Sequence, residues 1–266
     1  MTAISYHASI KDVQAQPLAT SGPFARREWF ERLEATQHGA LYAVAEDASG
    51  AVVLPLRRNG RRLESLLNWY AFTWRPLATP YGSLDSLSIA LAQALAAQTS
   101  HIVLDRLPHE DGTARQLQRT FKRAGWLVMC EPCDTNRFLP VDGRDFGTYL
   151  DSRPGPLRTT LKRKAKKVDV TIVKRFDADI WACYESIYAE SWKPEEGDPA
   201  LLRAFAEAEG AAGRIRLAVA RHDGAAVAAQ FWTVEDGTAY IHKLAHRESA
   251  KPLSPGTTLT AALLEH

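Results

Sequence analysis

The sequence lacks several features that would narrow its class at once. Three cysteines in 266 residues are too few, and odd in number, for a disulfide scaffold. No stretch approaches the roughly 18 consecutive apolar residues of a transmembrane helix. The opening residues MTAISYHASIKDV have no apolar core behind a positive start, so they do not resemble a signal peptide. We therefore expect no membrane span and a cytoplasmic location, the usual compartment of proteins that keep free thiols.

An excess of one charge sign is also missing. Lys+Arg 33 against Asp+Glu 31 leaves a net charge of +2, so no overall field directs the chain to nucleic acid or to a membrane. Hydrophobic residues at 45% and charged residues at 24% exclude a disordered chain, a collagen-like fibre and a coiled coil. The length allows about two domains at roughly 150 residues each.

The familiar catalytic signatures are absent as well. The sequence contains no GxSxG, no HExxH and no Walker loop. Cys130 and Cys133 form a single C-x-x-C pair, and a four-ligand zinc site would need a second cluster. The eight histidines show no ligand spacing. We therefore predict no metal, and we interpret the cysteines as two small, partly buried residues at the end of a strand.

What the sequence does contain is one order of elements that occurs twice: strand, helix, three-stranded meander, loop, helix. In the first half, apolar periodicity predicts strands at 3–9, 41–46, 51–57 and 61–70 and helices at 23–37 and 86–98. This half continues with a strand at 102–104, a helix at 113–124 and strands at 126–131 and 137–141. The turn Asn59-Gly60 is a strong hairpin signal.

The second half repeats this order and then stops. We predict strands at 168–176, 214–221, 225–234 and 238–247 and helices at 178–192, 199–209 and 257–265. Asp-Gly turns at 223–224 and 236–237 join the meander. The pattern predicts an α/β (α+β) fold of two tandem units, 1–145 and 146–266. Each is a mixed, mainly antiparallel sheet flanked by helices, and the second is expected to be truncated.

A basic segment lies near the start of the second predicted unit, before its first strand. It holds Arg158, Lys162, Arg163, Lys164, Lys166 and Lys167. A solvated helix face is the simplest interpretation. Two functional interpretations compete with it: binding to the phosphates of a nucleic acid, or lining a groove for an anionic substrate or the phosphates of a cofactor. Because the total charge is nearly neutral, we favour the groove and take Arg158 and Lys162 as candidate substrate ligands.

A strand, a loop and a helix start follow one another near the end of the sequence. The loop carries Ser254-Pro255-Gly256, and Thr257 and Thr258 open the helix. The unpaired N–H groups and the dipole at a helix start favour an anion, and a glycine lets the backbone approach it closely. An ordinary capped helix is the alternative interpretation.

The second half resembles the acetyltransferase-like domain of the GNAT superfamily, in its cellulose-biosynthesis (CelD-like) branch, a relative of the Fem aminoacyltransferases. The matching pieces are YLDSRPGPLRTTLKRKAKK, YAESWK, LAVARHDGAAVAAQFWTVEDGTAYIHKLAH and LSPGTTLTAALLEH. The resemblance implies two GNAT-like units. It also implies that an acyl-CoA diphosphate would lie on Ser254, Pro255, Gly256, Thr257 and Thr258. The loop departs from the family pattern, because it keeps one glycine where several are usual.

The resemblance also implies where the chemistry would take place. A backbone N–H of the fourth strand, near Leu244 or Ala245, would donate to the acyl carbonyl. His242 lies on that strand, and a histidine ordinarily titrates near neutral pH, so it is the candidate base. Lys243 is the second catalytic candidate, although alternation places only one of these two in a groove.

Three further residues are candidate substrate ligands. Trp192 and Lys193 end a predicted helix and would form a wall of the acceptor site. Gln230 shares a strand face with Trp232 and would line the same groove. GNAT-like sheets continue past the phosphate-loop helix with another strand, which this sequence lacks, so we expect an incomplete domain.

The implied activity is acyl transfer from acyl-CoA to an amine or hydroxyl of a polysaccharide precursor or a peptide. The partners would be a small-molecule donor and acceptor. A Fem-type transferase that uses aminoacyl-tRNA is the alternative within this class, and tRNA is the one nucleic acid that we retain as a partner. A non-catalytic basic module that binds RNA or another anionic polymer is the alternative from a different class.

Overall fold

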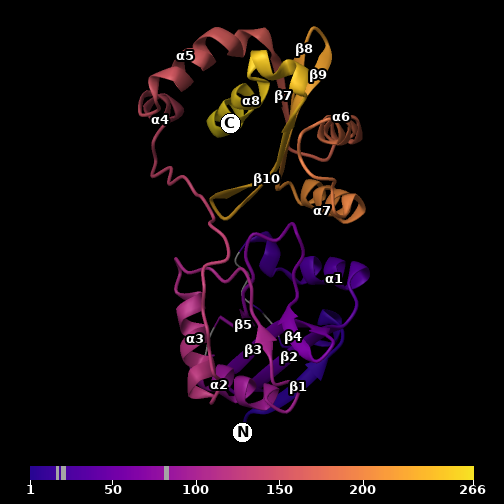
Figure 1. Cartoon of the computed structure of the whole chain (residues 1–266), viewed down its shortest axis with the longest axis vertical. Helices are drawn as coiled ribbons and strands as arrows, with labels where there is room; N and C mark the ends of the chain where they lie inside the picture. The colour runs from indigo at the N-terminus through magenta and orange to yellow at the C-terminus, as the bar shows by residue number, and fades with distance from the viewer. Residues whose placement is uncertain (16–17, 19–21, 81–83) are drawn as a thin grey trace. The chain divides into compact units, whose positions relative to one another are not determined.

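The structure is a computed structural model that describes residues 1–266 except 16–17, 19–21 and 81–83. It contains two compact units, which we call the N-terminal unit, Met1–Arg137, and the C-terminal unit, Phe138–His266. The division falls a few residues before the boundary that the sequence predicts. Each unit has its own sheet and its own helices (Figure 1).

The N-terminal unit is built on a six-stranded sheet. Its strands are β1 Ala3–His7, β2 Ala40–Asp47, β3 Gly50–Asn59, β4 Arg62–Ser65, β5 Leu77–Ala78 and β6 Ile102–Val103. Its helices are α1 Arg27–Thr36, α2 Leu84–Leu95 and α3 Thr113–Arg123, with short 3-10 turns at Ile10–Asp12 and Pro23–Ala25. The strand order is β1-β2-β3-β4-β6, with β5 paired to β3. All pairs are antiparallel except β4 with β6, which is parallel.

The strands of this sheet alternate between two covered faces. On β2, Ala43 and Ala45 belong to the core under α2 and α3. Tyr42 points to the other face, where its ring meets Phe30 of α1 at 6.1 Å between centroids. This alternation is the period of two that the sequence shows.

The C-terminal unit is built on a four-stranded antiparallel sheet in the order β10-β9-β8-β7. The strands are β7 Asp169–Val173, β8 Ile215–His222, β9 Ala225–Glu235 and β10 Thr238–His246. The helices are α4 Phe146–Asp151, α5 Gly155–Lys164, α6 Ala178–Ala189, α7 Pro199–Ala211 and α8 Pro255–Glu265, with 3-10 turns at Ala165–Lys167 and Glu248–Leu253. Both meander turns have positive φ at Asp and at Gly, as two-residue hairpins require.

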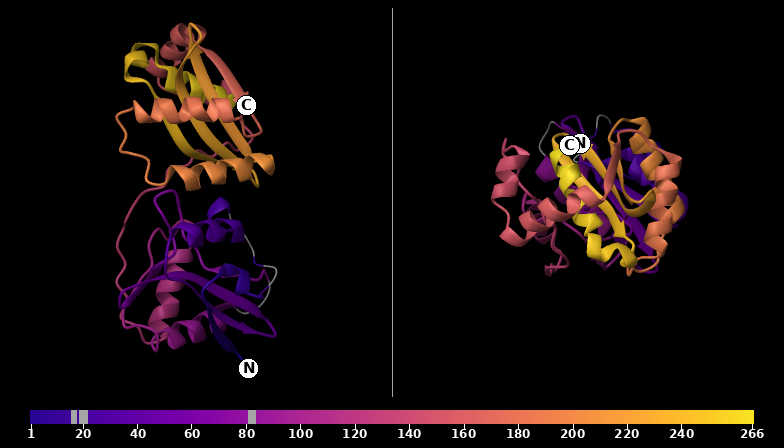
Figure 2. Two further views of the ribbon diagram at one scale, coloured as in Figure 1. Left: turned by 90° about the vertical axis from the view of Figure 1, so that its right-hand side faces the viewer. Right: turned by 90° about the horizontal axis from the view of Figure 1, so that it is seen from above.

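Helices cover both faces of this sheet (Figures 1 and 2). On β9, Phe231 packs against Trp181 of α6 and Phe205 of α7. Its neighbour Trp232 points the other way and joins the core under α8 with Leu259. One face therefore belongs to α6 and α7, and the opposite face belongs to α8.

The predicted fold class is confirmed: a mixed α/β chain has two sheets, of six and four strands, flanked by helices. Each unit contains the same antiparallel four-strand order, β1-β2-β3-β4 and β7-β8-β9-β10. The strands predicted at 126–131 and 137–141 are wrong, because the structure leaves both segments without regular pairing. Trp126 and Val128 do pack on the core, while Leu127 and Met129 are exposed, so alternation is present without a partner strand.

Candidate functional site

The fourth strand of the C-terminal unit, β10, forms one edge of its sheet. Along such an edge, every second residue points its N–H and C=O away from the neighbouring strand. Among the residues that the structure describes, nothing pairs with the outer edge of β10. Leu244 is exposed on this strand and Ala245 is buried. The outer edge of β10 therefore leaves some backbone N–H and C=O groups without a strand partner among the described residues.

A β-bulge interrupts β10 at His242. Ile241 pairs with Trp232 and Lys243 pairs with Phe231, which leaves His242 as the extra residue. The ring of His242 stacks on Phe231 at 4.9 Å between centroids. Both His242 and Lys243 therefore lie on the face of α6 and α7. The expectation that only one of them could do so is wrong, because the bulge breaks the alternation.

His242 is held within that face. Its Nε2 lies 2.7 Å from Thr233 Oγ1, a side chain that is fully buried. Phe205 meets the imidazole edge to face at 5.3 Å. The packing fixes the orientation of the ring and gives it a hydroxyl partner.

The start of α8 leaves backbone donors open. Ser254 precedes the helix in the left-handed region at φ 52, and Pro255, which has no N–H, is the first helical residue. Thr258 N–H donates to Ser254 O at 3.2 Å. Among the described residues, the N–H groups of Gly256 and Thr257 have no partner, and the buried Thr258 Oγ1 has none either. The helix begins two residues earlier than the sequence predicts.

Gln230, on β9, bonds to the first turns of α8 from the sheet. Its Nε2 donates to Gly256 O at 3.2 Å and to Thr260 Oγ1 at 2.7 Å, and its Oε1 accepts from Trp232 Nε1 at 2.8 Å. Gln230 and Trp232 thus share a face as predicted. That face is covered by α8, so Gln230 fixes the helix start and does not lie with the residues against α6 and α7.

The basic segment reaches the same helix start through one residue. Lys164, at the end of α5, donates from Nζ to Ser254 Oγ at 3.1 Å. Arg158 is exposed and lies 4.0 Å from Asp151, and Lys162 is exposed. The two candidate anion sites of the sequence therefore adjoin at Lys164, whereas Arg158 and Lys162 belong to the solvent-facing side of α5.

An aromatic pair lies at the end of β10. Trp192 follows the end of α6, and its ring meets His246 at 4.9 Å between centroids. A Cβ on Gly256 would lie 3.7 Å from His246 Nδ1. His246 therefore touches the loop after α6 on one side and adjoins the start of α8 on the other. Helix α6 ends at Ala189, so Trp192 and Lys193 belong to that loop and not to the helix.

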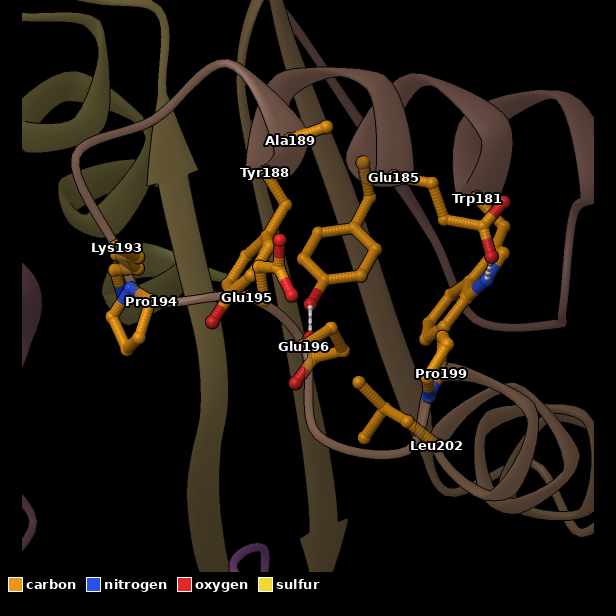
Figure 3. A pocket seen from close by; sticks show the side chains of 11 residues that line it. Trp181, Glu185, Tyr188, Ala189, Lys193, Pro194, Glu195, Glu196, Pro199 and Leu202 are labelled. Atoms are coloured by element: carbon orange, nitrogen blue, oxygen red, sulfur yellow. Dashed lines mark hydrogen bonds between the residues drawn. The ribbon is translucent and has the colours of Figure 1, made fainter.

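A pocket of about 370 Å³ opens between α6, the loop after it and the start of α7, and we call it the α6–α7 pocket (Figure 3). Its lining combines three aromatic rings, three carboxylates and one lysine: Trp181, Tyr184, Tyr188, Glu185, Glu195, Glu196 and Lys193. A cavity of this size suits a small molecule.

A buried network forms one side of the pocket. Tyr184 donates from its hydroxyl to Glu196 Oε2 at 2.7 Å, as drawn in Figure 3. Lys243 Nζ donates to Glu196 Oε1 at 2.6 Å and lies 5.1 Å from the ring centroid of Tyr188. The side chains of Lys243 and Glu196 are only 8% and 12% exposed. Because neither charged group is well solvated, each charge is stabilised mainly by the other.

The network shifts the acidity of its neighbours. Burial, and then repulsion from Lys243, hold the pKa of Lys193 below its ordinary value, against the attraction of Glu196. Burial, and then the charge of Glu196, raise the pKa of Tyr188. Lys193 therefore gives up its proton more readily than a surface lysine, and Tyr188 keeps its own.

The structure thus brings Lys243 and Lys193 together, with Trp192 next to Lys193, and brings the start of α8 close to His246. It also adds residues that the sequence analysis missed: Glu196, Tyr184 and Tyr188. The pair Glu195-Glu196 follows Pro194 in a short polar loop, which carries no signal of burial. Only the contact with Lys243, 47 residues further along the chain, reveals the role of Glu196.

Three features of the described part of the chain bear on cofactors and partners. No group of three or more His, Cys, Asp or Glu side chains is arranged to hold a metal ion. Cys130 and Cys133 are free and exposed, not partly buried as expected. No described helix has the length and apolar character to cross a membrane.

Comparison with known proteins bears on the C-terminal unit. Residues 156–266 match the family model described as acetyltransferase (GNAT) domain. The GNAT resemblance inferred from the sequence is therefore confirmed for this part of the chain as a similarity to that domain. The CelD-like branch and the relation to the Fem enzymes stay predictions.

This chain also matches a solved structure. It is the C-terminal domain (DUF2156) of a putative lysylphosphatidylglycerol synthetase from Agrobacterium fabrum. The identity is 15%, the TM-score is 0.49, and the match covers 88% of this chain and 68% of that one. No curated protein matches this chain.

Proposed function

We propose that the C-terminal unit binds an acyl-CoA at the start of α8 and transfers its acyl group to an acceptor beside β10. The match of residues 156–266 to an acetyltransferase domain supports the reaction class. The observation that carries the proposal is the helix start itself. There the N–H groups of Gly256 and Thr257 and the buried Thr258 Oγ1 have no partner among the described residues.

These groups fit a phosphate. Two N–H groups at the positive end of α8 can donate to phosphate oxygens. Lys164, bound to Ser254 Oγ at 3.1 Å, adds a positive charge beside them. Charge-assisted hydrogen bonds of this kind contribute roughly 1.5–3 kcal/mol each before desolvation is subtracted.

The β10 edge supports the transfer step. A backbone N–H near Leu244 or Ala245 would donate to the acyl carbonyl and stabilise the negative charge that develops on its oxygen. The bound acyl-CoA would supply a thioester carbon, which bonds to the acceptor nitrogen or oxygen while its bond to sulfur breaks. The proton of the attacking group is balanced by the proton that the leaving thiolate takes up. Trp192, exposed beside His246, would cover the chain between the phosphates and the reacting carbon.

The acceptor is an amine or a hydroxyl under this proposal. The two acceptor classes are those expected from the sequence, a polysaccharide precursor and a peptide. The residues nearest to such an acceptor are those of the α6–α7 pocket, because Lys243 joins that pocket to β10.

The variant Gly256→Val tests the donor site. A Cβ at this position would meet His246 Nδ1 at an ordinary 3.7 Å, so we expect the variant to fold. The larger side chain would hold a phosphate away from the N–H groups. We expect coenzyme A affinity, measured by titration calorimetry, to fall about tenfold or more, which corresponds to a loss of about 1.4 kcal/mol.

The matched control is Gly155→Val, because Gly155 opens α5 and a Cβ there would meet nothing within 4 Å. Circular dichroism and the thermal midpoint establish that both variants are folded. Equal coenzyme A affinity in wild type and a folded Gly256→Val protein would remove this helix start from the site.

The basic segment favours a second donor, an aminoacyl-tRNA. Lys164 places that segment against the loop before α8, so the phosphates of a tRNA end would meet the same groups. A titration with mixed tRNA at several salt concentrations separates the two donors. Affinity that falls steeply with salt, together with no coenzyme A binding, would favour tRNA, or a non-catalytic polyanion binder if no acyl transfer follows.

A further inference from the structure

The N-terminal unit has a cavity of its own, outside residues 156–266, which match the acetyltransferase domain. Its volume is about 440 Å³. We call it the α2–α3 pocket, because its lining comes from the start of α2, the turn before α3 and one side of α3. The polar side chains that line it are Asp85, Asp111, Gln116, Arg119, Thr120 and Arg123. A cavity of this volume suits a small molecule, and a polar lining suits a polar one.

The two carboxylates of the α2–α3 pocket differ in how fully they are used. Asp111 forms an ion pair with Arg75, and its Oδ1 accepts from Thr113 N–H at 2.9 Å. Asp85 accepts from Gln116 Nε2 at 3.2 Å through Oδ1. Among the residues that the structure describes, no cationic side chain pairs with Asp85. The pocket therefore retains one carboxylate that can still accept hydrogen bonds from a ligand.

The positive charge of the pocket comes from Arg119 and Arg123, which lie one turn apart on α3. In the described part of the chain, neither guanidinium group is paired with a carboxylate. Arg119 donates from Nε to a backbone carbonyl, Arg115 O, at 3.4 Å. Two neighbouring guanidinium groups on one cavity wall therefore remain able to bind an anion.

Thr120 lines the same cavity although it is only 5% exposed. A threonine or serine within a helix can donate to the carbonyl four residues earlier, as Ser88 does to Leu84 O at 2.6 Å in α2. The hydroxyl of Thr120 has no hydrogen-bond partner among the described residues. A buried polar group without a partner is unfavourable. A polar ligand in the pocket would supply that partner.

A phosphate group matches these donors better than a carboxylate does. Each guanidinium can donate two parallel hydrogen bonds to an oxyanion, and the hydroxyl of Thr120 can donate one more. A phosphomonoester has three free oxygens and nearly two negative charges at neutral pH, whereas a carboxylate has two oxygens and one charge. Asp85 repels a bare phosphate, but it can accept from a hydroxyl group on the same ligand.

We propose that the α2–α3 pocket binds a small phosphomonoester that also carries hydroxyl groups, such as a sugar phosphate. The phosphate lies on Arg119, Arg123 and Thr120, and a hydroxyl of the ligand donates to Asp85. Neither the donor nor the acceptor of the proposed acyl transfer takes part, so this binding is independent of the transferase function.

The experiment is a calorimetric titration of the full chain at pH 7 with glucose 6-phosphate, glucuronate, inorganic phosphate and glucose. Glucuronate carries a carboxylate in place of the phosphate, and inorganic phosphate lacks the sugar hydroxyls. We expect glucose 6-phosphate to bind about tenfold more tightly than either, because each lacks charge-assisted or hydrogen-bonded contacts that the whole ligand makes. Glucose should not bind measurably.

Variants of the lining test the individual contacts. Arg119→Gln and Arg123→Gln should each weaken glucose 6-phosphate about tenfold, because each removes a charge-assisted contact. Thr120→Val keeps the buried volume and should weaken this ligand about threefold. Asp85→Asn should strengthen inorganic phosphate and reduce the preference for the sugar phosphate. The matched control is Arg115→Gln, an exposed charge on α3 that does not line the pocket, and its effect should stay below about twofold.

An equal loss of affinity in Arg115→Gln and Arg119→Gln would overturn the proposal, because it would indicate a diffuse attraction of α3 for anions. Glucuronate binding as tight as that of glucose 6-phosphate, or no binding of either phosphate compound, would overturn it as well. Circular dichroism and the thermal midpoint establish that each variant is folded.

A coenzyme A titration of the same variants separates this pocket from the start of α8. We expect Arg119→Gln and Arg123→Gln to leave coenzyme A affinity unchanged. A loss of coenzyme A binding in both variants would overturn the assignment, because the phosphates of the acyl donor would then occupy the α2–α3 pocket. Binding of glucose 6-phosphate without any coenzyme A binding would contradict the proposed function and leave this inference standing.

Discussion

The two units share one strand order and differ at the fourth strand. In the N-terminal unit, β4 pairs with β3 on one side and with the parallel strand β6 on the other. In the C-terminal unit, β10 pairs with β9, and its outer edge has no partner among the described residues. The same strand order therefore occurs with a paired fourth strand in one unit and with an unpaired outer edge in the other.

The helix that follows the meander also differs between the two units. Helix α2 buries Leu87, Leu91, Ala92 and Leu95 under the first sheet. Helix α8 buries Leu259 and Leu263, but its first turn is polar and receives Gln230 from the sheet. The strand order is therefore common to both units, while the polar contacts described at the start of α8 come from residues of the C-terminal unit, Gln230 among them.

The variant Lys243→Met is expected to have the largest effect on stability. This change leaves Glu196 buried without its cation, and removing one partner of a buried pair costs about 3–5 kcal/mol. We expect urea unfolding followed by circular dichroism to show that loss of stability. The double variant Lys243→Met with Glu196→Gln should recover part of it.

The control is Lys251→Met, because Lys251 is 72% exposed and its pair with Glu248 lies on the surface. A Lys243→Met protein as stable as the wild type would show that the pair does not hold the pocket together.

The N-terminal unit has an ion pair that can be compared with Lys243–Glu196. Its carboxylate belongs to Glu64, which accepts from Arg57 at 2.8 Å and from Asn59 at 3.0 Å. The bond from Arg57, the largest cause, holds the pKa of Glu64 below its ordinary 4.5. A lowered pKa means that this stabilisation is complete above pH 4.5 and disappears as the pH falls through the lower, folded-state value. We expect Glu64→Gln to cost about 1.5–3 kcal/mol at pH 7.

The measurement is chemical unfolding of wild type and Glu64→Gln at pH 7 and at pH 3, with the exposed Glu46→Gln as control. The difference between wild type and variant should shrink at the lower pH. A difference that persists or grows there would contradict the ion pair as its cause.

The smallest expected effect belongs to His242→Phe. Phenylalanine keeps the stack on Phe231 but removes a hydrogen-bond partner of the buried Thr233 hydroxyl, which costs about 1–3 kcal/mol. Coenzyme A affinity should stay unchanged, because His242 lies on the face away from α8. If acyl transfer persists in this variant, His242 is a packing residue. A loss of transfer with the fold and coenzyme A affinity intact would support its predicted role as the base.

Several elements could be predicted from residues close together in the sequence. The turns Asp223-Gly224 and Asp236-Gly237 determine the hairpins of the second meander, because only a few residue types tolerate positive φ at both positions. Periodicity located the long strands and the helices, and the equal order of elements predicted the repeated topology. Resemblance to a known family added the reaction class, which the family model supports for residues 156–266.

Tertiary structure decided what periodicity could not. Trp126 and Val128 alternate with exposed neighbours as a strand would, but a strand also needs a partner, and the segment has none among the described residues. The bulge at His242 turned Lys243 to the same face as its neighbour.

The α6–α7 pocket shows most clearly what local sequence patterns cannot predict. Its central contact joins Glu196 to Lys243 across 47 residues of chain. In the sequence, Glu196 is one of two adjacent glutamates in a polar loop, and nothing local distinguishes it from Glu195. Turn chemistry and periodicity act within a few residues, so the sequence alone predicted most of the elements and their order. The packing of α6, α7 and β10 decided which carboxylate is buried on a lysine and which stays exposed, because desolvation depends on the whole surroundings of a charge.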